Sequence, residues 1–490
     1  MLQVLLVLNC GWTDLGTPKR VADTGRSLKQ VRPLAAASQS ATGAGYLDLA
    51  SNHPASRYPR RPRRTRRQGE DSQMKCMSPR DRQEHLTAAR ALKMAGSPHA
   101  YVRGSTVKFY EWLRENRACK VPDGPAVWIC GDCHSGNLGP IADSKGQIEI
   151  QIRDLDQTVI GNPNHDLIRL ALSLASAARG SALPGVATAQ MLEHMTEGYE
   201  CGLRIDPNRS RVEAQRPDCI KIVMKRAMGR TWKHLARERL EDTKPTIPLG
   251  KRFWPLTREE RRELIALFDL KRVRGLVTSL KGRDRDLRIE VLDAAYWMKG
   301  CSSLGRLRYA VLLGLGSKPG KHDDYCLIDI KEAMPAAAPR SNGSAMPRDN
   351  GKRVVQGAQH LAPALGERMM AARFLGQSVF LRELLPQDLK LEIDQISHEE
   401  AVGAARFLAA VLGKAHGRQM DSPTRKSFLR DLKLRRSRRL DAPSWLWSSV
   451  VDLAGIHEVA YLEHCRQYAL LTRPPKARTR HGRSRRRERN

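Results

Sequence analysis

The sequence predicts an α+β protein, because strand-like and helix-like patterns occur in separate blocks along its 490 residues. Four short runs have the apolar or alternating pattern of strands: 126–129, 148–152, 307–315 and 325–331. After Pro163, apolar residues recur on one helical face, and a second apolar helix leads into His416. A chain of this length can bury a large core and hold more than one lobe.

Residues 130–166 are the most informative segment, since polar side chains are concentrated there beside predicted strands. Six of them are candidates for a functional site: Asp132, His134, Asn137, Asp154, Asp156 and Asp166. Mg²⁺ prefers hard oxygen ligands, usually one or two carboxylates together with phosphate oxygens and water. A further carboxylate can orient or deprotonate an attacking hydroxyl group. The segment therefore predicts a site for a divalent metal and phosphate.

The motif Gly131-Asp132-x-His134-x-Gly136-Asn137, followed by Asp154 at a strand end, resembles the catalytic loop and metal-binding aspartate of protein-kinase-like enzymes. The aminoglycoside and choline phosphotransferases are the nearest branch, and they share the spacing of 166 − 154 = 12 positions to the next aspartate. The resemblance implies catalytic roles for Asp132 and His134. It implies metal ligation by Asn137 and Asp154, and a bracing role for Asp166. The branch usually has a histidine at position 130, where this chain has cysteine.

Over roughly residues 75–470 the chain is also similar to an uncharacterised bacterial family, domain-of-unknown-function family 2252. Four blocks carry this resemblance: 93–104, 300–305, 328–333 and 379–384. That family is itself assigned a kinase-like fold. The resemblance thus implies a two-lobed, protein-kinase-like architecture with helical insertions, and it implies no particular substrate.

The order of the blocks predicts a circular permutation with the catalytic half first. In ordinary kinases the glycine-rich loop and its lysine precede the catalytic loop, whereas here the corresponding blocks follow it. The resemblance then assigns nucleotide binding to six residues: Gly300, Ser302, Ser303, Gly305, Lys331 and Glu383. Lysine would reach the α- and β-phosphates, and residues 381–385 would meet the adenine. Taken alone, a hairpin turn explains the glycines and an ordinary strand position explains the lysine.

Two features of the predicted nucleotide site can be checked by geometry. Kinases pair the lysine with a helix glutamate, but the matching helix here offers Gln356, with Glu332 or Glu367 as substitutes. We also expect the Lys331 ammonium to lie across a cleft from the Asp154 carboxylate, with room for a triphosphate between them.

The predicted parts follow one another along the chain. They are a disordered basic leader at 1–74, a catalytic-loop half at 75–185, a helical insertion at 186–290, a phosphate-clamping small lobe at 291–397, C-terminal helices at 398–472 and a disordered basic tail at 473–490. The helical insertion is the candidate for acceptor selection. Residues 335–351, rich in Ala, Pro, Ser, Asn and Gly, are typical of a flexible surface loop.

A competing motif, Cys130-x-x-Cys133-His134, matches the attachment sequence of c-type haem and also suggests redox chemistry. Haem attachment needs export, and the apolar N-terminus lacks a basic region before it, so no haem is expected. A zinc site at these residues would need a fourth ligand.

The ten cysteines show no disulfide-framework spacing, which favours a reducing cytoplasm. No apolar run reaches the roughly 20 residues of a membrane span.

The net charge of +33 is unevenly distributed, and two segments supply 7 + 8 = 15 of it. Residues 57–67 hold seven arginines and no acids, and residues 473–490 hold nine Lys or Arg against one Glu. Such tails attract polyanions without reading sequence, so non-specific polyanion contact stays open. Aromatic residues make up 5% of the chain, too few to indicate a stacking platform for single-stranded nucleic acid.

Together these observations predict a cytoplasmic phosphotransferase that binds ATP and Mg²⁺ and phosphorylates a hydroxyl group of a small molecule or a protein. The alternative is a nucleotide-binding pseudokinase or scaffold without turnover, which the glutamine at position 356 favours.

Overall fold

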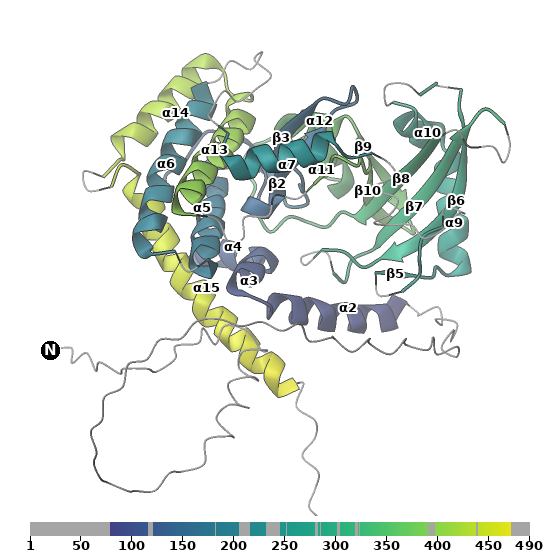
Figure 1. Ribbon diagram of the computed structural model, residues 1–490, viewed down its shortest axis with the longest axis horizontal. Coiled ribbons are helices and arrows are strands. Elements are labelled where there is room, and N and C mark those ends of the chain that lie inside the picture. The colour runs from purple at the N-terminus through teal and green to yellow at the C-terminus, as the bar shows by residue number, and fades with distance from the viewer. Residues whose placement is uncertain are drawn as a thin grey trace, which may run out of the picture.

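The computed structural model describes residues 79–471, apart from 116–120, 182, 205–215, 232–245, 251, 280–282, 285, 301–303, 319–321, 323, 390, 392–396 and 438–439. The predicted leader at 1–74, the tail at 473–490, and Ser302 and Ser303 lie outside the described residues. Figure 1 shows a region of packed helices on one side and a large sheet on the other.

The large sheet has six antiparallel strands in the order β5-β6-β7-β8-β10-β9. They are β5 (Phe253–Trp254), β6 (Arg288–Trp297), β7 (Arg308–Gly316), β8 (Asp324–Glu332), β9 (Met369–Phe374) and β10 (Gln377–Glu383). The predicted strands at 307–315 and 325–331 are thus confirmed as β7 and β8. One face of the sheet packs its apolar side chains against α9 (Arg258–Asp269) and α10 (Lys271–Val277).

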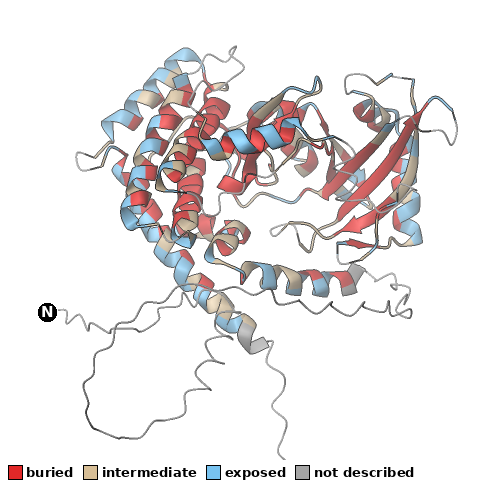
Figure 2. Ribbon diagram, in the orientation of Figure 1, coloured by how far each residue is buried: buried red, intermediate tan, exposed pale blue. Residues whose placement is uncertain are grey.

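The helical region contains α5 (Pro163–Gly180), α6 (Gly185–Arg204), α7 (Asp218–Met228), α13 (His398–Gly417), α14 (Ser422–Leu434) and α15 (Ser444–Leu471). Helices α6 and α13 pack closely because glycines face the partner backbone. A Cβ atom on Gly202 would lie 2.1 Å from the Ala410 carbonyl oxygen, and one on Gly413 would lie 2.2 Å from that of Tyr199. Figure 2 shows α13 almost entirely buried.

Two small sheets lie between the helices and the large sheet (Figure 1). Strand β1 (Val127–Ile129) pairs with β4 (Val159–Gly161), and β2 (Leu138–Ala142) pairs with β3 (Ile148–Ile152), after the 3₁₀ turn η1 (Ser135–Asn137). Helix α11 (Asn350–Leu361) packs against β9 and β10 on one side and against β1 on the other, and α12 (Pro363–Gly366) follows it. These elements position the segment 130–166 beside the large sheet.

Helix α2 (Pro79–Met94) extends from the helical region to the large sheet, and α3 (Pro98–Gly104) and α4 (Thr106–Glu115) follow it (Figure 1). At the sheet end, Arg82 forms a buried ion pair with Glu260 at 2.6 Å. At the other end, the Tyr461 hydroxyl of α15 donates to the Ala95 carbonyl oxygen at 3.2 Å. Helix α2 therefore ties the two regions together.

The predicted α+β class is confirmed, with several antiparallel sheets beside many helices. The kinase-like arrangement of lobes stays a prediction. Among the described helices, none is both long and apolar enough to cross a membrane.

Candidate functional site

Asp166 holds the predicted catalytic loop from the first turn of α5. Its buried carboxylate accepts the Cys130 N–H at 2.6 Å and the Gly131 N–H at 2.9 Å. Two backbone donors on one carboxylate fix the direction in which the loop leaves β1. This is the bracing contact that the resemblance implied for Asp166.

A buried polar chain extends from this carboxylate into the helical region. The Nε2 atom of His416 lies 3.2 Å from Asp166 Oδ2, and the Tyr199 hydroxyl lies 2.9 Å from His416 Nδ1. Burial raises the pKa of Tyr199 well above its usual value, so the phenol stays protonated. The sequence indicated a helix ending at His416 but gave no sign of this contact, because its partners lie on separate helices.

Gly131 allows the loop to turn directly after β1. Its φ angle is 74°, and a Cβ atom there would lie 2.2 Å from the Gln157 carbonyl oxygen. The Tyr110 hydroxyl donates to the Gly131 carbonyl oxygen at 2.7 Å. The loop is therefore enclosed by α4 on one side and by residue 157 on the other.

Asp132 is buried and forms an ion pair with Arg169, a fully buried residue of α5. The Arg169 guanidinium also lies over the Phe109 ring, 5.2 Å from its centroid. Burial raises the pKa of Asp132 above its ordinary value, although the charge of Arg169 acts in the opposite direction. Arg169 was not predicted from the sequence, where it appears as one charge within an apolar helix.

His134 is buried beside this pair, and its Nδ1 atom has no hydrogen-bond partner among the described residues. Burial lowers the pKa of His134 well below its usual value, and the charges of Arg103 and Arg169 act in the same direction. The half-buried Arg103 lies against Gly136, where a Cβ atom would approach its Cζ to 3.0 Å. His134 is thus a neutral imidazole at pH 7.

Asn137 connects the two predicted metal-binding segments. Its Nδ2 group donates to the Asp132 carbonyl oxygen at 3.0 Å and to the Asp154 carbonyl oxygen at 3.4 Å. Within the described residues, its side-chain oxygen forms no hydrogen bond. Asn137 itself is buried, whereas the Asp154 side chain is 42% exposed, so only one of the two adjacent predicted ligands is open to solvent.

Lys331 brings the large sheet to this loop. Its Nζ atom lies 3.2 Å from Asp154 Oδ1 and 3.3 Å from Oδ2, although 177 positions separate the two residues in sequence. The ammonium group also contacts the carboxylate of Asp156. The predicted cleft between Lys331 and Asp154 is wrong for this structure, because the ammonium and carboxylate groups touch directly.

The two carboxylates respond differently to their shared cation. Burial acts to raise the pKa of Asp154, but the charges of Lys331, Arg382 and Arg308 outweigh it and hold that pKa below its usual range. Burial and the neighbouring Asp154 charge raise the pKa of Asp156. One carboxylate of the pair is therefore firmly ionised, and the other takes up a proton more readily.

In kinases a helix glutamate pairs with the phosphate-binding lysine, and Gln356, Glu332 and Glu367 were the candidates for that position. In this structure Asp156 pairs with Lys331 instead. Gln356 is half-buried on α11 and has no recorded contact with the ammonium group. Glu332 accepts the Leu307 N–H at 2.8 Å, and Glu367 accepts the Ser144 hydroxyl at 2.8 Å. Asp156 takes the role because it follows Asp154 by two residues and its carboxylate reaches the same ammonium group.

Helix α11 contributes a cation at this point instead of an acid. The Arg353 side chain donates to the Asp156 carbonyl oxygen at 3.0 Å and to the Met334 carbonyl oxygen at 2.8 Å. It also contacts the Thr158 carbonyl oxygen. Arg353 therefore fixes the backbone that carries Asp156, and acts on Lys331 only through it.

Two arginines share the face of the sheet that carries Lys331. Arg308 lies directly opposite Lys331 in the β7–β8 register, and Arg382 lies opposite Asp329. Arg308 binds Asp329 at 2.9 and 2.6 Å, and Arg382 Nε lies 3.2 Å from the same carboxylate. Directly opposite residues, and residues two apart on one strand, point to the same face. Sequence analysis missed this cluster because it depends on strand pairing.

The glycine turn at 300–305 joins β6 to β7 and is held by α2. Gly300 and Gly305 have φ angles of 98° and 94°, which favour glycine. The Lys93 ammonium donates to the Gly300 carbonyl oxygen at 2.6 Å. Strands β6 and β7 are antiparallel neighbours, so the segment that contains Gly300 and Gly305 connects them at the same end of β7 as Arg308. Contact of this segment with phosphate stays a prediction.

Glu383 has a structural partner at the end of β10. Its buried carboxylate binds Arg283 through two contacts of 2.8 Å. Its carbonyl oxygen accepts from Arg368 at 2.8 Å, and the next N–H, from Leu384, donates to the Leu327 carbonyl oxygen at 2.9 Å. These groups are therefore engaged within the protein, and contact of Glu383 with a nucleotide base stays a prediction.

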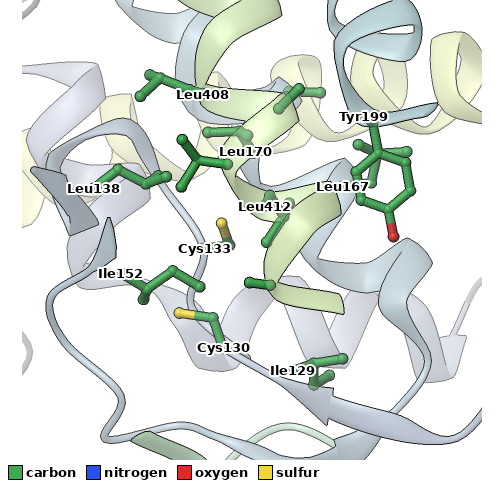
Figure 3. Close-up of a cluster of buried hydrophobic side chains, with 14 of the residues drawn as sticks. Ile129, Cys130, Cys133, Leu138, Ile152, Leu167, Leu170, Tyr199, Leu408 and Leu412 are labelled. Atoms are coloured by element: carbon green, nitrogen blue, oxygen red, sulfur yellow. The ribbon is translucent and has the colours of Figure 1, made fainter. Parts of the chain in front are cut away.

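Cys130 and Cys133 fill the apolar core beneath the loop. Figure 3 shows both among Leu138, Ile152 and Leu170. The Cys133 contact and then burial raise the pKa of Cys130 well above its usual value. In the part of the chain that the structure describes, no group of three or more His, Cys, Asp or Glu side chains is placed to hold a metal.

A family model described as "uncharacterized protein conserved in bacteria (DUF2252)" matches residues 82–467. No curated protein and no solved structure matches the chain. The match covers most of the sequence and includes every site residue described above, so the chain belongs to the DUF2252 family.

Proposed function

We propose that this protein is a kinase-like phosphotransferase that uses a Mg²⁺-nucleotide, with ATP as the expected donor and a hydroxyl compound as the acceptor. The observation that carries the proposal is the contact of 3.2 Å between Lys331 Nζ and Asp154 Oδ1. It brings the lysine of one half beside the aspartate of the other, the two groups that a kinase uses on opposite sides of its nucleotide phosphates. A nucleotide would have to separate this ion pair in order to bind between the two groups.

The residues present fit a magnesium ion. Asp154 offers a partly exposed carboxylate, and the Asn137 side-chain oxygen has no described hydrogen-bond donor. Mg²⁺ is commonly held by one or two protein oxygens, with phosphate oxygens and water completing its shell. When bound, the ion would neutralise charge on the transferring phosphoryl group.

The chain's own side chains would orient the reactants and hold the proton. Asp132 would accept the proton of the acceptor's hydroxyl group. As that proton leaves, the hydroxyl oxygen bonds to the γ-phosphorus, and the bond between the γ-phosphorus and the β–γ bridging oxygen breaks. Burial raises the pKa of Asp132, which favours accepting a proton. Arg169 would keep the Asp132 carboxylate in place, and Lys331 with Arg308 would supply positive charge to the phosphates.

A nucleotide-binding scaffold without turnover is the second candidate. The observation that favours it is the ion pair between Asp132 and the fully buried Arg169, because a paired carboxylate is a weaker base. Under this hypothesis the protein binds the nucleotide but does not transfer its phosphoryl group.

Hydrolysis of ATP and binding of ATP, both with Mg²⁺, separate the two candidates. The wild type is compared with Asp154→Ala and with the matched control Asp218→Ala, whose side chain is 75% exposed. Turnover that Asp154→Ala abolishes and the control retains supports the phosphotransferase. Binding without turnover supports the scaffold, and an absence of both rejects a nucleotide site.

A further inference from the structure

A cavity lies beside the catalytic loop, against Tyr110 and Gln157. It has a volume of about 1060 Å³ and follows α4 from Thr106 to Arg114. The stretch of α4 that lines it therefore extends over about 12 Å, since each helical residue rises about 1.5 Å. We define the α4 groove as the space between α4 and residues 335–339. Its volume is that of a small-molecule site, which typically measures about 300–1,000 Å³.

The α4 groove is connected to the candidate site through its walls. Tyr110 and Gln157 both line it, and both also enclose Gly131, one residue before Asp132. The opposite wall is the segment that was expected to be a flexible surface loop. That expectation is wrong at Ala338, which is buried, and at Ala337, whose N–H donates to the Gln157 side chain at 2.7 Å.

Four arginines line the α4 groove: Arg90, Arg114, Arg306 and Arg435. Within the described residues, none of the four forms an ion pair. Elsewhere the arginines of this protein are commonly paired, as Arg82, Arg169 and Arg308 are. The only acidic residue among the lining residues is Asp123. Arg90 donates to the Gly104 carbonyl oxygen at 3.1 Å, which leaves its charge uncompensated. Four arginines against one aspartate give the lining of the groove a positive excess.

We propose that the α4 groove binds the acceptor, a small hydroxyl compound that already carries two or more phosphate or carboxylate groups. Arginine forks match phosphate and carboxylate oxygens and are less strongly hydrated than ammonium groups. These arginines come from separate parts of the chain: Arg114 lies on α4, Arg306 lies next to the glycine turn, and Arg435 directly follows α14. An acceptor held by these arginines would lie against Tyr110 and Gln157, the two lining residues that enclose Gly131, which precedes Asp132 in the sequence.

This inference rests on the proposed phosphotransferase activity for its chemistry, but its test needs no turnover. The probe is fructose 1,6-bisphosphate, with uncharged fructose as its partner, and binding is measured by calorimetry without nucleotide or Mg²⁺. We expect the bisphosphate to bind, fructose to give no signal, and the affinity for the bisphosphate to fall as salt rises.

The variant Arg114→Gln/Arg435→Gln should weaken bisphosphate binding at least tenfold. Its matched control, Arg179→Gln/Arg466→Gln, removes the same two charges from exposed arginines outside the groove and should leave binding unchanged. No bisphosphate binding, or equal losses in both double variants, would overturn the assignment.

Failure of this inference and failure of the proposed function give different results. If ATP turnover depends on Asp132 while the groove variant binds the bisphosphate like the wild type, the groove assignment falls and the activity stands. If the groove variant loses bisphosphate binding while ATP turnover does not depend on Asp132, the groove is an anion site and the proposed activity falls.

Discussion

Lys331 on β8 finds its counter-charge in Asp156, a residue of the loop that carries the predicted metal ligand. The ammonium is 3% exposed and lies between the carboxylates of Asp154 and Asp156. The large sheet and the loop 130–166 are therefore joined by a charge contact at the centre of the candidate site.

Lys331→Met should destabilise the fold, because it leaves two neighbouring carboxylates without their cation. Breaking a buried ion pair by removing one partner costs about 3–5 kcal/mol. Urea unfolding measures the loss, and the double variant with Asp156→Asn should recover part of it. Lys221→Met, which removes an exposed lysine, serves as the control. A cost for Lys331→Met no larger than that of the control would contradict the contact.

Gly131→Ala should be far more destabilising than the same change at another glycine with positive φ. At Gly131 the new Cβ would lie 2.2 Å from a backbone oxygen, whereas at Gly146, with φ of 80°, nothing lies within 4 Å. The left-handed conformation costs alanine about 1–2 kcal/mol at both positions. The clash should add roughly 1–3 kcal/mol at Gly131 alone, and thermal unfolding measures both. Equal losses would mean that the loop does not pass this close to Gln157.

Asp166→Asn should loosen the catalytic loop. An asparagine keeps one acceptor oxygen but turns an NH₂ group toward donors, so at least one of the Cys130 and Gly131 N–H groups loses its partner. A buried unsatisfied donor costs about 1–3 kcal/mol. The control is Asp349→Asn, at the N-cap of α11, where asparagine caps a helix about as well as aspartate does. Its free energy of unfolding should change by only about 0.3 kcal/mol. Unfolding in urea compares the two, and similar values would argue against the bracing role.

Acid should destabilise the protein through His457 on α15. Burial lowers the pKa of His457 to about 4, and the charge of Arg169 acts in the same direction. In the unfolded chain a histidine titrates near 6.5, so between about pH 6.5 and 4 the unfolded state binds a proton that the folded state does not. The contribution of His457 to the free energy of unfolding is therefore fully present above pH 6.5, and it declines by about 3 kcal/mol as the pH falls to 4.

Urea unfolding at several pH values tests this, with His457→Gln as the comparison. The variant keeps a donor for the Leu453 carbonyl oxygen, which lies 2.9 Å from the histidine Nδ1. Its stability should depend less steeply on pH between 4 and 6.5. The same slope in both proteins would show that this histidine does not titrate abnormally.

The sequence was sufficient for features that depend on local pattern. The strands β7 and β8 and the helix α5 follow from periodicity, whereas the bracing role of Asp166 came only from the family resemblance. The resemblance predicted that Lys331 and Asp154 face each other across a cleft; the structure brings the two residues together, although 177 positions separate them, but with their charged groups in direct contact.

The rest of the site depends on tertiary contacts that a single sequence does not specify. Arg169 reaches Asp132 because α5 packs beneath the loop, and His416 reaches Asp166 from a different helix. Asp156 was placed in the loop without a role, since nothing in the sequence shows which carboxylate faces an ammonium on another strand. The α4 groove likewise forms only when α4 meets residues 335–339.

The most direct test of the account is ATP turnover by Asp132→Asn, with Mg²⁺-ATP binding measured on the same protein. The account predicts that hydrolysis falls roughly 10²–10⁴-fold, the usual contribution of a positioned base, while nucleotide affinity stays within about threefold of the wild type. Hydrolysis at the wild-type rate in this variant would contradict the assignment of Asp132 and the phosphotransferase built on it.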